Sequence, residues 1–544
     1  MMKRSWLRTC LLYSPLMLCV GIMLPRLMSP QFGFFDDGFS MLTARSIWAG
    51  QWMLGMDPVG GRFRPVYWLY FAFLFRLFGN NPFWYFMGNL FLWLVITFCL
   101  MRLARHFGLD RKATWFVGLT FVISGPVLEN VYNLSKPELL QAVWLMLLLL
   151  CCAHYVRAEN RYRKIAMVVL MAGLVLLATT TKETGLLLVP ASFASLLITW
   201  LWYRRIGQTG HPAVKQREAL LVASFIGVLV YFVLYTVSVH RNLLNYGSGS
   251  LNYSLPWVKS QVLLLWSWMR RDYLYLLPIG LASILVVFRK HNRTWLLLLL
   301  ECLLWLAIWL SIDILWKYLP EYYLLPIALI AALVCGIFFS LIVSLLHGPL
   351  IGRILAWGAY GISGLLLLLT LPNQVTNGRL QLAMDRANAE MLAYVVQHAP
   401  RGSTVWININ PPNEYATEFS TWVTQLDGRP DLQVDYFHSQ DLAKTQTGSQ
   451  EVWIVSPFME NQFYPSVRVG MSELPTRQWN KTLDQYLAGR GELVSLFRQS
   501  FPSSNLDPLR FFCPFARSLS YCKVPDAPLD RRVFAYGWKI YRLP

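Results

Sequence analysis

Charged residues are scarce in this sequence. They make up only 14% of its 544 residues, whereas 56% are hydrophobic, and soluble domains usually carry about 25% charged residues. This composition excludes a purely soluble enzyme. The chain also contains no P-loop, no glycine-rich nucleotide-binding motif and no internal repeat, so we do not expect a cytosolic nucleotide as its substrate.

Acidic residues are especially few in the first two-thirds of the chain. Residues 1–371 contain 31 Lys and Arg but only 13 Asp and Glu, whereas residues 372–544 contain 17 and 16. A net charge of +19 can indicate nucleic-acid binding. Here the basic residues fall in short loops between long apolar runs, as they do in membrane proteins. We therefore expect membrane lipids as partners and no nucleic acid.

The apolar runs predict a polytopic α-helical membrane protein with about 11 spans, because a helix that crosses the bilayer needs about 20 largely apolar residues. Every second connection is basic, so the positive-inside rule places those connections and the N-terminus in the cytoplasm. The odd number of spans places the C-terminal part outside. The predicted spans lie near residues 9–28, 82–104, 113–129, 138–156, 165–181, 185–203, 219–239, 272–289, 294–312, 322–346 and 353–371.

The remaining apolar runs are shorter. Residues 66–78 and 256–270 are predicted as short interfacial helices or additional spans. The first run follows a basic start but contains Pro25 and Arg26 and no small-residue cleavage site, so we interpret it as an uncleaved membrane anchor. Residues 1–371 are thus the predicted membrane domain, and a bacterial inner membrane is the expected location.

From residue 372 the hydrophobicity becomes intermittent, which predicts a small extracytoplasmic α/β domain over residues 372–544. Cys513 and Cys522 close a short polar loop with no His or further Cys nearby, so a disulfide is favoured over a zinc site. Strands are expected at 405–409, 432–437, 451–456 and 533–543, and helices at 385–397, 413–426 and 479–489.

The first outward loop contains two adjacent carboxylates, Asp36 and Asp37. In a loop both can converge on one point, where they could bind a divalent metal, or one could act as a base. The alternative is a solvated loop that supplies an N-cap for the helix starting near Gly38. The sequence leaves both explanations, and metal dependence, open.

More ionisable residues lie at the outward ends of the predicted spans. Such residues are costly at membrane depth and usually functional, although each one alone could be a snorkelling or capping residue. Cations beside carboxylates suit transfer from a lipid-linked phosphate, because cations stabilise the leaving phosphate and a carboxylate can deprotonate an acceptor hydroxyl. These residues are Arg62, Arg64, Glu129, Lys136, Glu138, Lys182, Glu183, Asp313, Lys317, Glu321, Tyr322 and Tyr323.

The order of several short motifs is more specific than any one of them. An acidic pair precedes an amphipathic A-R-x-x-x-x-G-x-W helix, a basic-Pro-aromatic stretch comes before the second span, and an acidic residue begins the fourth. A Thr-Lys-x-x-Gly…Pro hairpin and a Tyr-x-x-Pro element follow. The matching residues are Asp36, Asp37, Ala44, Arg45, Gly50, Trp52, Arg64, Pro65, Tyr67, Trp68, Glu138, Thr181, Lys182, Pro190, Tyr323 and Pro326.

In this order the sequence resembles the polyprenyl-phosphate-sugar-dependent membrane glycosyltransferases of the GT-C fold, the group of protein O-mannosyltransferases and lipid A aminoarabinose transferases. The resemblance covers roughly residues 33–330. It implies transfer of a hexosyl or pentosyl group from a polyprenyl-phosphate donor to an acceptor hydroxyl on the outer face, with inversion. The acceptor could be a lipid, a glycan or a protein.

The resemblance also implies roles for individual residues. Asp36, Asp37 and Glu138 would be catalytic, with Asp36 as base or substrate anchor and Asp37 as its partner or metal ligand. Donor phosphate binding would fall to Arg64, Lys182, Lys317 and Tyr323. Acceptor-binding or supporting positions would be Arg62, Lys136, Glu183 and Glu321.

Two other classes of function remain as alternatives. A transporter or flippase of a lipid-linked or envelope substrate also uses many spans, but such proteins tend to show internal repeats and charges near the bilayer midplane. A scaffold with a partner-binding tail is the third class, because the tail is rich in aromatic residues that suit either binding or an ordinary core.

Overall fold

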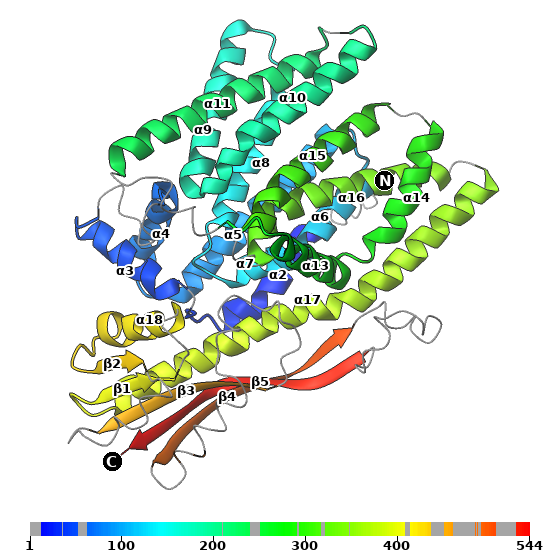
Figure 1. Ribbon diagram of the computed structural model, residues 1–544. Helices are drawn as coiled ribbons and strands as arrows, with labels where there is room; N and C mark the ends of the chain where they lie inside the picture. The colour runs from blue at the N-terminus through cyan, green and yellow to red at the C-terminus, as the bar shows by residue number, and fades with distance from the viewer. Residues whose placement is uncertain are drawn as a thin grey trace, which may run out of the picture.

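The computed structural model shows a bundle of apolar helices joined by one long helix to a five-stranded sheet (Figure 1). The chain is a polytopic helical membrane protein with a smaller sheet in its C-terminal part. The residues described are 12–34, 36–52, 62–208, 210–239, 251–290, 293–316, 321–346, 349–408, 414–436, 451–460, 485, 487, 491–506 and 529–543.

Within this part of the chain, eight helices are long and apolar enough to cross a membrane. All eight coincide with predicted spans. They comprise α5 (Pro82–His106), α8 (Glu138–Tyr155), α9 (Arg161–Thr181), η1 with α10 (Glu183–Leu187 and Leu188–Arg205), α11 (Pro212–Ser238), α15 (Arg293–Leu315), the end of η2 (Glu321–Leu324) with α16 (Leu325–Leu346), and the first part of α17 (Leu350–His398).

The predicted span at 113–129 is broken. It consists of α6 (Arg111–Val122) and α7 (Gly125–Tyr132), which meet at an angle of 54° and would make a ninth span if counted together. The break has a local cause: Ser124 is the extended N-cap of α7, and Pro126 follows in its first turn, where a proline has no N–H to donate to the preceding helix.

Several helices are shorter than a full span. Helices α2 (Ser14–Met28), α4 (Pro65–Phe78) and α14 (Leu276–Lys290) have 14 or 15 residues, and α13 (Leu255–Asp272) has 18 but does not count among the eight. The difference from the 11 predicted spans therefore arises mainly at α2, at α14 and at the α6–α7 break. A further short helix, α3 (Asp37–Trp48), begins at the second acidic residue.

The helix α17 continues through the predicted domain boundary. Its backbone stays helical from Leu350 to His398, so the last apolar span and the start of the C-terminal region form a single 49-residue rod. Figure 1 shows this helix running from the bundle across the sheet. The division at residues 371 and 372 stays a prediction, but the two parts share one continuous helix.

The C-terminal region forms one mixed sheet, β2-β1-β3-β5-β4. Strands β1 (Thr404–Ile407), β2 (Gln433–Tyr436) and β3 (Val452–Glu460) pair in parallel, whereas β5 (Leu529–Leu543) runs antiparallel to β3 and β4 (Glu492–Leu506). The four predicted strands are present. Sequence analysis missed β4, because Ser, Gln and Pro interrupt its apolar alternation.

Helices α18 (Glu414–Ser420) and η3 (Thr421–Leu426) fall within the predicted 413–426 helix. The predicted helix at 479–489 and the predicted disulfide of Cys513 and Cys522 lie outside the described residues.

The helical bundle and the sheet share one core. Asn388 of α17 accepts hydrogen bonds from the Tyr536 hydroxyl (2.9 Å) and the Trp538 indole (2.8 Å) of β5. Phe34, which precedes the acidic pair, packs its ring against Phe419 and Trp538. The segment before α3 is therefore enclosed partly by C-terminal residues.

Close helix packing in the bundle generates a stability prediction. At Gly336 of α16 a Cβ atom would overlap Val117 of α6 and lie 3.1 Å from Leu109, and small residues allow such close approach between membrane helices. We expect Gly336→Ala to destabilise the protein by about 1–3 kcal/mol, measured as a lower midpoint of thermal unfolding in detergent. The control Gly361→Ala, where a Cβ meets nothing within 4 Å, should not lower that midpoint.

Candidate functional site

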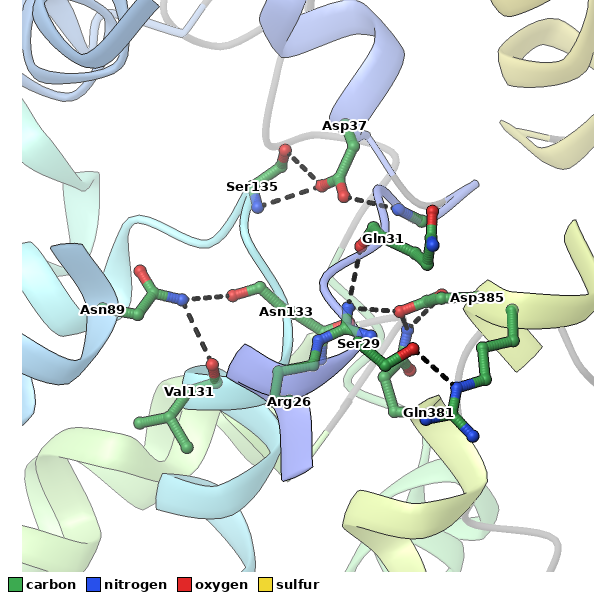
Figure 2. Close-up of polar contacts among 12 residues, drawn as sticks. Arg26, Ser29, Gln31, Asp37, Asn89, Val131, Asn133, Ser135, Gln381 and Asp385 are labelled. Atoms are coloured by element: carbon green, nitrogen blue, oxygen red, sulfur yellow. Dashed lines mark hydrogen bonds and ion pairs between the residues drawn. The ribbon is translucent and has the colours of Figure 1, made fainter. Parts of the chain in front are cut away.

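The acidic pair lies where the segment after α2 turns into α3, and its two carboxylates have different surroundings. Asp37 is buried, with 4% exposure. Its Oδ1 accepts hydrogen bonds from the Ser135 hydroxyl (2.6 Å) and the Ser135 backbone N–H (3.2 Å), and its Oδ2 accepts one from the Gly33 N–H (2.7 Å). Figure 2 shows Asp37 between these two segments. Asp37 therefore ties the first outward loop to the segment before α8.

Burial sets the protonation behaviour of Asp37. Desolvation raises the pKa of this carboxyl to about 6, and nearby Asp385 acts in the same direction, while the hydrogen bonds from Ser135 and Gly33 and the charge of Lys136 oppose the rise. Asp37 thus becomes protonated and loses its charge as the pH falls through about 6.

Asp36 is oriented differently, through an unusual backbone conformation. Its φ is +68°, the left-handed region that non-glycine residues seldom adopt outside turns and functional sites. Asp36 occupies the N-cap position of α3, yet its side chain makes no capping hydrogen bond. Instead Oδ2 forms an ion pair with Lys136 Nζ at 2.8 Å, and the side chain remains 42% exposed. The Asp36 side chain therefore does not provide the helix cap that the alternative explanation expected of this loop.

Glu418 takes over the capping of α3 from the far end of the sequence. Its Oε2 accepts the Gly38 N–H at 2.6 Å, and its Oε1 accepts the Phe39 N–H at 3.0 Å. Glu418 is fully buried, and desolvation, together with the charges of Asp36 and Asp37, raises its pKa well above the usual value. A Cβ at Gly38 would lie 2.5 Å from Glu418 Oε2, so this capping requires glycine there.

A buried ion pair between Arg26 and Asp385 supports the loop. Arg26 Nη2 lies 2.5 Å from Asp385 Oδ2 and donates to the Gln31 carbonyl at 3.1 Å. Gln381 donates to both oxygens of Asp385, at 2.7 and 2.8 Å. Because α17 supplies Gln381 and Asp385, this pair joins the long helix to the end of α2 (Figure 2). Sequence analysis noted Arg26 only as a sign against signal-peptide cleavage, and it missed Asp385 and Glu418.

The Glu138 carboxylate forms another ion pair, with Lys182. Glu138 begins α8, Lys182 follows α9, and both are buried. The turn at Lys182 is fixed because Gln141 donates to the carbonyls of Ala178 (3.2 Å) and Lys182 (2.9 Å). Among the described residues, Glu138 Oε2 has no hydrogen-bond partner.

Two tyrosine rings connect the Asp36–Lys136 pair with the Glu138–Lys182 pair. Lys136 Nζ lies 4.7 Å from the centroid of the Tyr322 ring, and Lys182 Nζ lies 3.7 Å from that of Tyr323. The two rings themselves meet edge to face with centroids 4.8 Å apart. Asp36–Lys136–Tyr322 and Glu138–Lys182–Tyr323 therefore form two adjacent carboxylate–lysine–tyrosine columns. We call these six residues the paired columns. Asp313 of α15 lies within electrostatic range of Lys182 and Glu138.

The other predicted residues are less central. Arg64 is buried at the start of α4, with its guanidinium 5.7 Å from the Tyr67 ring and 5.5 Å from the Trp68 ring, and Tyr67 lies within electrostatic range of both acidic residues. Arg62 and Glu183 are half-buried near the same end of the bundle. Lys317 lies outside the described residues, and of Glu321 only the backbone is described.

The residues around the acidic pair do not fit a divalent cation. Such a cation needs about six oxygen ligands, but both Asp37 oxygens already accept N–H or O–H donors, and Lys136 holds an ammonium against Asp36. In the part of the chain that is described, no group of three or more His, Cys, Asp or Glu side chains is arranged so that it could hold a metal ion. We derive no step through a metal.

These contacts define what the site can do chemically. Asp36 is the half-exposed carboxylate, paired with a lysine and held by a constrained backbone, which suits a base or a substrate-binding group. Lys136 pairs with Asp36, and Lys182 lies on the neighbouring column, so the paired columns hold two ammonium groups. Two fixed cations are suited to an anionic phosphate ligand.

The protonation of Asp37 predicts a pH effect on activity. Since only the ionised form can accept all three hydrogen bonds, activity should fall as the pH drops through about 6. Ser135→Ala removes a hydrogen bond that favours the ionised form, and such a bond is worth about 1.5–3 kcal/mol. We expect the acid limb of the pH–rate profile to move upward by about one unit. Ser192→Ala, another buried serine, is the control and should not move it.

Capping by Glu418 predicts that the C-terminal region is needed for activity. Gln at this position offers one acceptor oxygen instead of two, so one N–H of α3 is left without its partner. We expect Glu418→Gln to destabilise the fold by about 1–2 kcal/mol and to lower turnover at least tenfold. Glu492→Gln, which alters an exposed ion pair with Arg542, is the control. Equal turnover of the two variants would contradict this role.

Comparisons with known proteins bear on the fold. No protein-family model matches the chain, and no curated protein matches its sequence. Similar solved structures include the Archaeoglobus fulgidus oligosaccharyltransferase with a tethered acceptor peptide (12% identity, TM-score 0.48, covering 79% of this chain and 64% of that one). Another is ArnT from Cupriavidus metallidurans bound to undecaprenyl phosphate (11% identity, TM-score 0.46, covering 81% and 92%).

This chain spans less than two-thirds of the archaeal enzyme's length. Identities of 11–12% and TM-scores below 0.5 are too low to transfer an activity or a site residue to this protein.

Proposed function

We propose that this protein is a membrane glycosyltransferase that moves a sugar from a polyprenyl-phosphate donor to an acceptor hydroxyl at the outer end of the helical bundle. The observation that supports this most directly is the pair of columns: two lysines on adjacent tyrosines, beside an exposed carboxylate held in a left-handed conformation. The location proposed is a bacterial inner membrane, with the C-terminal region outside.

In this proposal the donor phosphate lies against Lys136 and Lys182. Both ammonium groups are largely buried, with side-chain exposures of 2% and 11%, so their attraction for a phosphate is weakly screened by water. Arg64 lies nearby at the start of α4 and adds a third positive charge. Tyr322 and Tyr323 place aromatic faces under the two lysines and keep them from moving toward the lipid phase.

Asp36 acts as the base. The acceptor hydroxyl oxygen forms a bond with the anomeric carbon, and its proton passes to the Asp36 carboxylate. The bond between the anomeric carbon and the phosphate oxygen breaks, and polyprenyl phosphate leaves with the bonding electrons. Attack opposite the leaving phosphate inverts the anomeric centre. Asp37 does not react in this scheme but positions Asp36 through its hydrogen bonds to Ser135 and Gly33.

Buried charge is also found elsewhere in the bundle, which bears on the transporter alternative. Arg217 of α11 forms a two-point ion pair with Glu301 of α15, at 2.6 and 3.2 Å, and Thr199 donates to Glu301 at 2.6 Å. This buried pair is separate from the ionisable residues at the outward ends of the predicted spans. Arg217 and Thr199 are both closely partnered with Glu301. Their cluster is therefore explained as a structural link between α10, α11 and α15.

Removal of the proposed base should abolish transfer. The assay uses the protein in lipid nanodiscs with a panel of polyprenyl-phosphate sugars, a crude envelope extract as acceptor, and release of free polyprenyl phosphate as the readout. General base catalysis contributes about 10²–10⁴ in rate, so Asp36→Asn should lower release at least a hundredfold. Glu159→Gln, an exposed carboxylate just beyond the opposite end of α8, should retain it. Unchanged release by Asp36→Asn would refute the proposal.

A further inference from the structure

A large apolar groove lies beside α2. Its volume is about 640 Å³, and its walls come from α2, the α6–α7 break and α17, including Leu18, Ile22, Ile123, Leu128, Leu368 and Leu371. These helices cross near the centre of Figure 1. The volume is in the range of small-molecule sites, about 300–1,000 Å³, so the groove is large enough for lipid chains.

The groove extends from membrane depth to the level of the candidate site. The apolar span of α17 ends at Leu371, whereas Gly378, Arg379 and Leu382, which also line the groove, lie beyond that end. At this upper end Leu382 is one helical turn before Asp385, the residue that pairs with Arg26 beneath the Gly33–Asp37 contact. The wall residue Tyr132 likewise lies three residues before Ser135, which binds Asp37. The upper end of the groove therefore lies within one helical turn, along the chain, of Asp385 and Ser135, two residues that hold the loop of the acidic pair.

The lining has one charge, and it is positive. Among the residues whose side chains the structure describes, only Tyr132 and Arg379 bring polar side chains to the groove, and none of those that line it is acidic. The Tyr132 hydroxyl already donates to the Ile22 carbonyl at 2.6 Å. Arg379 is exposed at the upper end of the groove. An amphiphile with apolar chains and an anionic head group complements this distribution.

We propose that this groove binds the chains of an anionic membrane lipid, with its head group at Arg379, and that this lipid carries the acceptor hydroxyl. This inference rests on the proposed glycosyl transfer. The hydroxyl oxygen bonds to the anomeric carbon, its proton goes to Asp36, and polyprenyl phosphate leaves from the paired columns. None of the groove-lining residues belongs to the paired columns, so donor and acceptor have separate entrances.

The chemistry of the lining favours a lipid over a peptide acceptor. A peptide in the groove would bring backbone N–H and C=O groups, and each such group that is buried without a partner is costly. Of the described side chains in the walls, Tyr132 and Arg379 are the polar partners available, whereas hydrocarbon chains need none.

Two variants test the groove without disturbing the paired columns. Gly21 lines the groove, and a Cβ there would meet nothing within 4 Å, so Gly21→Leu fills the space without a clash at its Cβ. Gly173→Leu, at an equally open position of α9 outside the groove, is the matched control. Arg379→Gln removes the head-group charge, and Arg353→Gln, another exposed arginine of α17, is its control.

The experiment is photo-crosslinking of the full chain in nanodiscs. The probes carry a diazirine in one chain and are diacyl phosphatidylglycerol, diacyl phosphatidylcholine with the same chains, and polyprenyl phosphate, with labelled sites mapped by mass spectrometry. We expect phosphatidylglycerol to label the groove segments of α2 and α17 at least fivefold more than phosphatidylcholine does. Gly21→Leu should reduce this labelling at least fivefold, and Arg379→Gln should remove the preference for the anionic lipid.

Several results would overturn the inference. These are equal labelling of Gly21→Leu and Gly173→Leu, absence of groove labelling, or preferential labelling by polyprenyl phosphate, which would make the groove the donor-chain site. Labelling needs no turnover, so it is independent of the proposed function. Groove labelling without any polyprenyl phosphate release would contradict the glycosyltransferase proposal, whereas release without groove labelling would contradict only the acceptor groove.

Discussion

The geometry of the candidate site depends on which side chain caps α3. A helix start leaves backbone N–H groups without intrahelical partners, and an aspartate at the N-cap position normally accepts one of them. Here Asp36 is in the left-handed conformation and does not do so, while Glu418 accepts two, from Gly38 and Phe39. Asp36 can therefore face Lys136 and the surface. Glu418, which lies 380 positions after Gly38 in the chain, thus leaves the Asp36 carboxylate available for chemistry.

This arrangement makes the C-terminal region part of the site. Glu418 caps α3, Asp385 of α17 holds Arg26 beside the same loop, and Phe34 packs against Phe419 and Trp538. Through these contacts the sheet and the long helix α17 fix the segment that carries the acidic pair. The membrane helices supply the remaining parts: Lys136 lies between α7 and α8, Glu138 begins α8, and Lys182 follows α9. The contact between the buried Tyr322 and the half-buried Tyr323 sets the spacing between them.

Much of this could be predicted from the sequence, because the governing signals are local. Apolar runs located the eight long helices, and alternation located four of the five strands. The residues of the paired columns were also named in advance, since charges at span ends are costly and therefore informative. The α6–α7 break was not predicted, because the apolar run continues across Pro126.

The partnerships between distant residues could not be predicted. Glu418 and Asp385 belong to ordinary-looking helical segments, and nothing within a few residues of either indicates that it meets α3 or Arg26. The left-handed backbone of Asp36 is likewise imposed by the fold, since an aspartate before a helix normally predicts an N-cap. Among the described residues, the groove too becomes visible only when α2, α7 and α17 are assembled.

The most direct test of the account is a structure of the protein with polyprenyl phosphate bound, determined by electron cryo-microscopy in nanodiscs. The account predicts that the phosphate lies within hydrogen-bond distance of Lys136 or Lys182, with the Asp36 carboxylate facing the open side of the phosphate. A polyprenyl phosphate whose phosphate lies at the Arg217–Glu301 cluster, or at Arg379 where the acceptor lipid is proposed to bind, would contradict it.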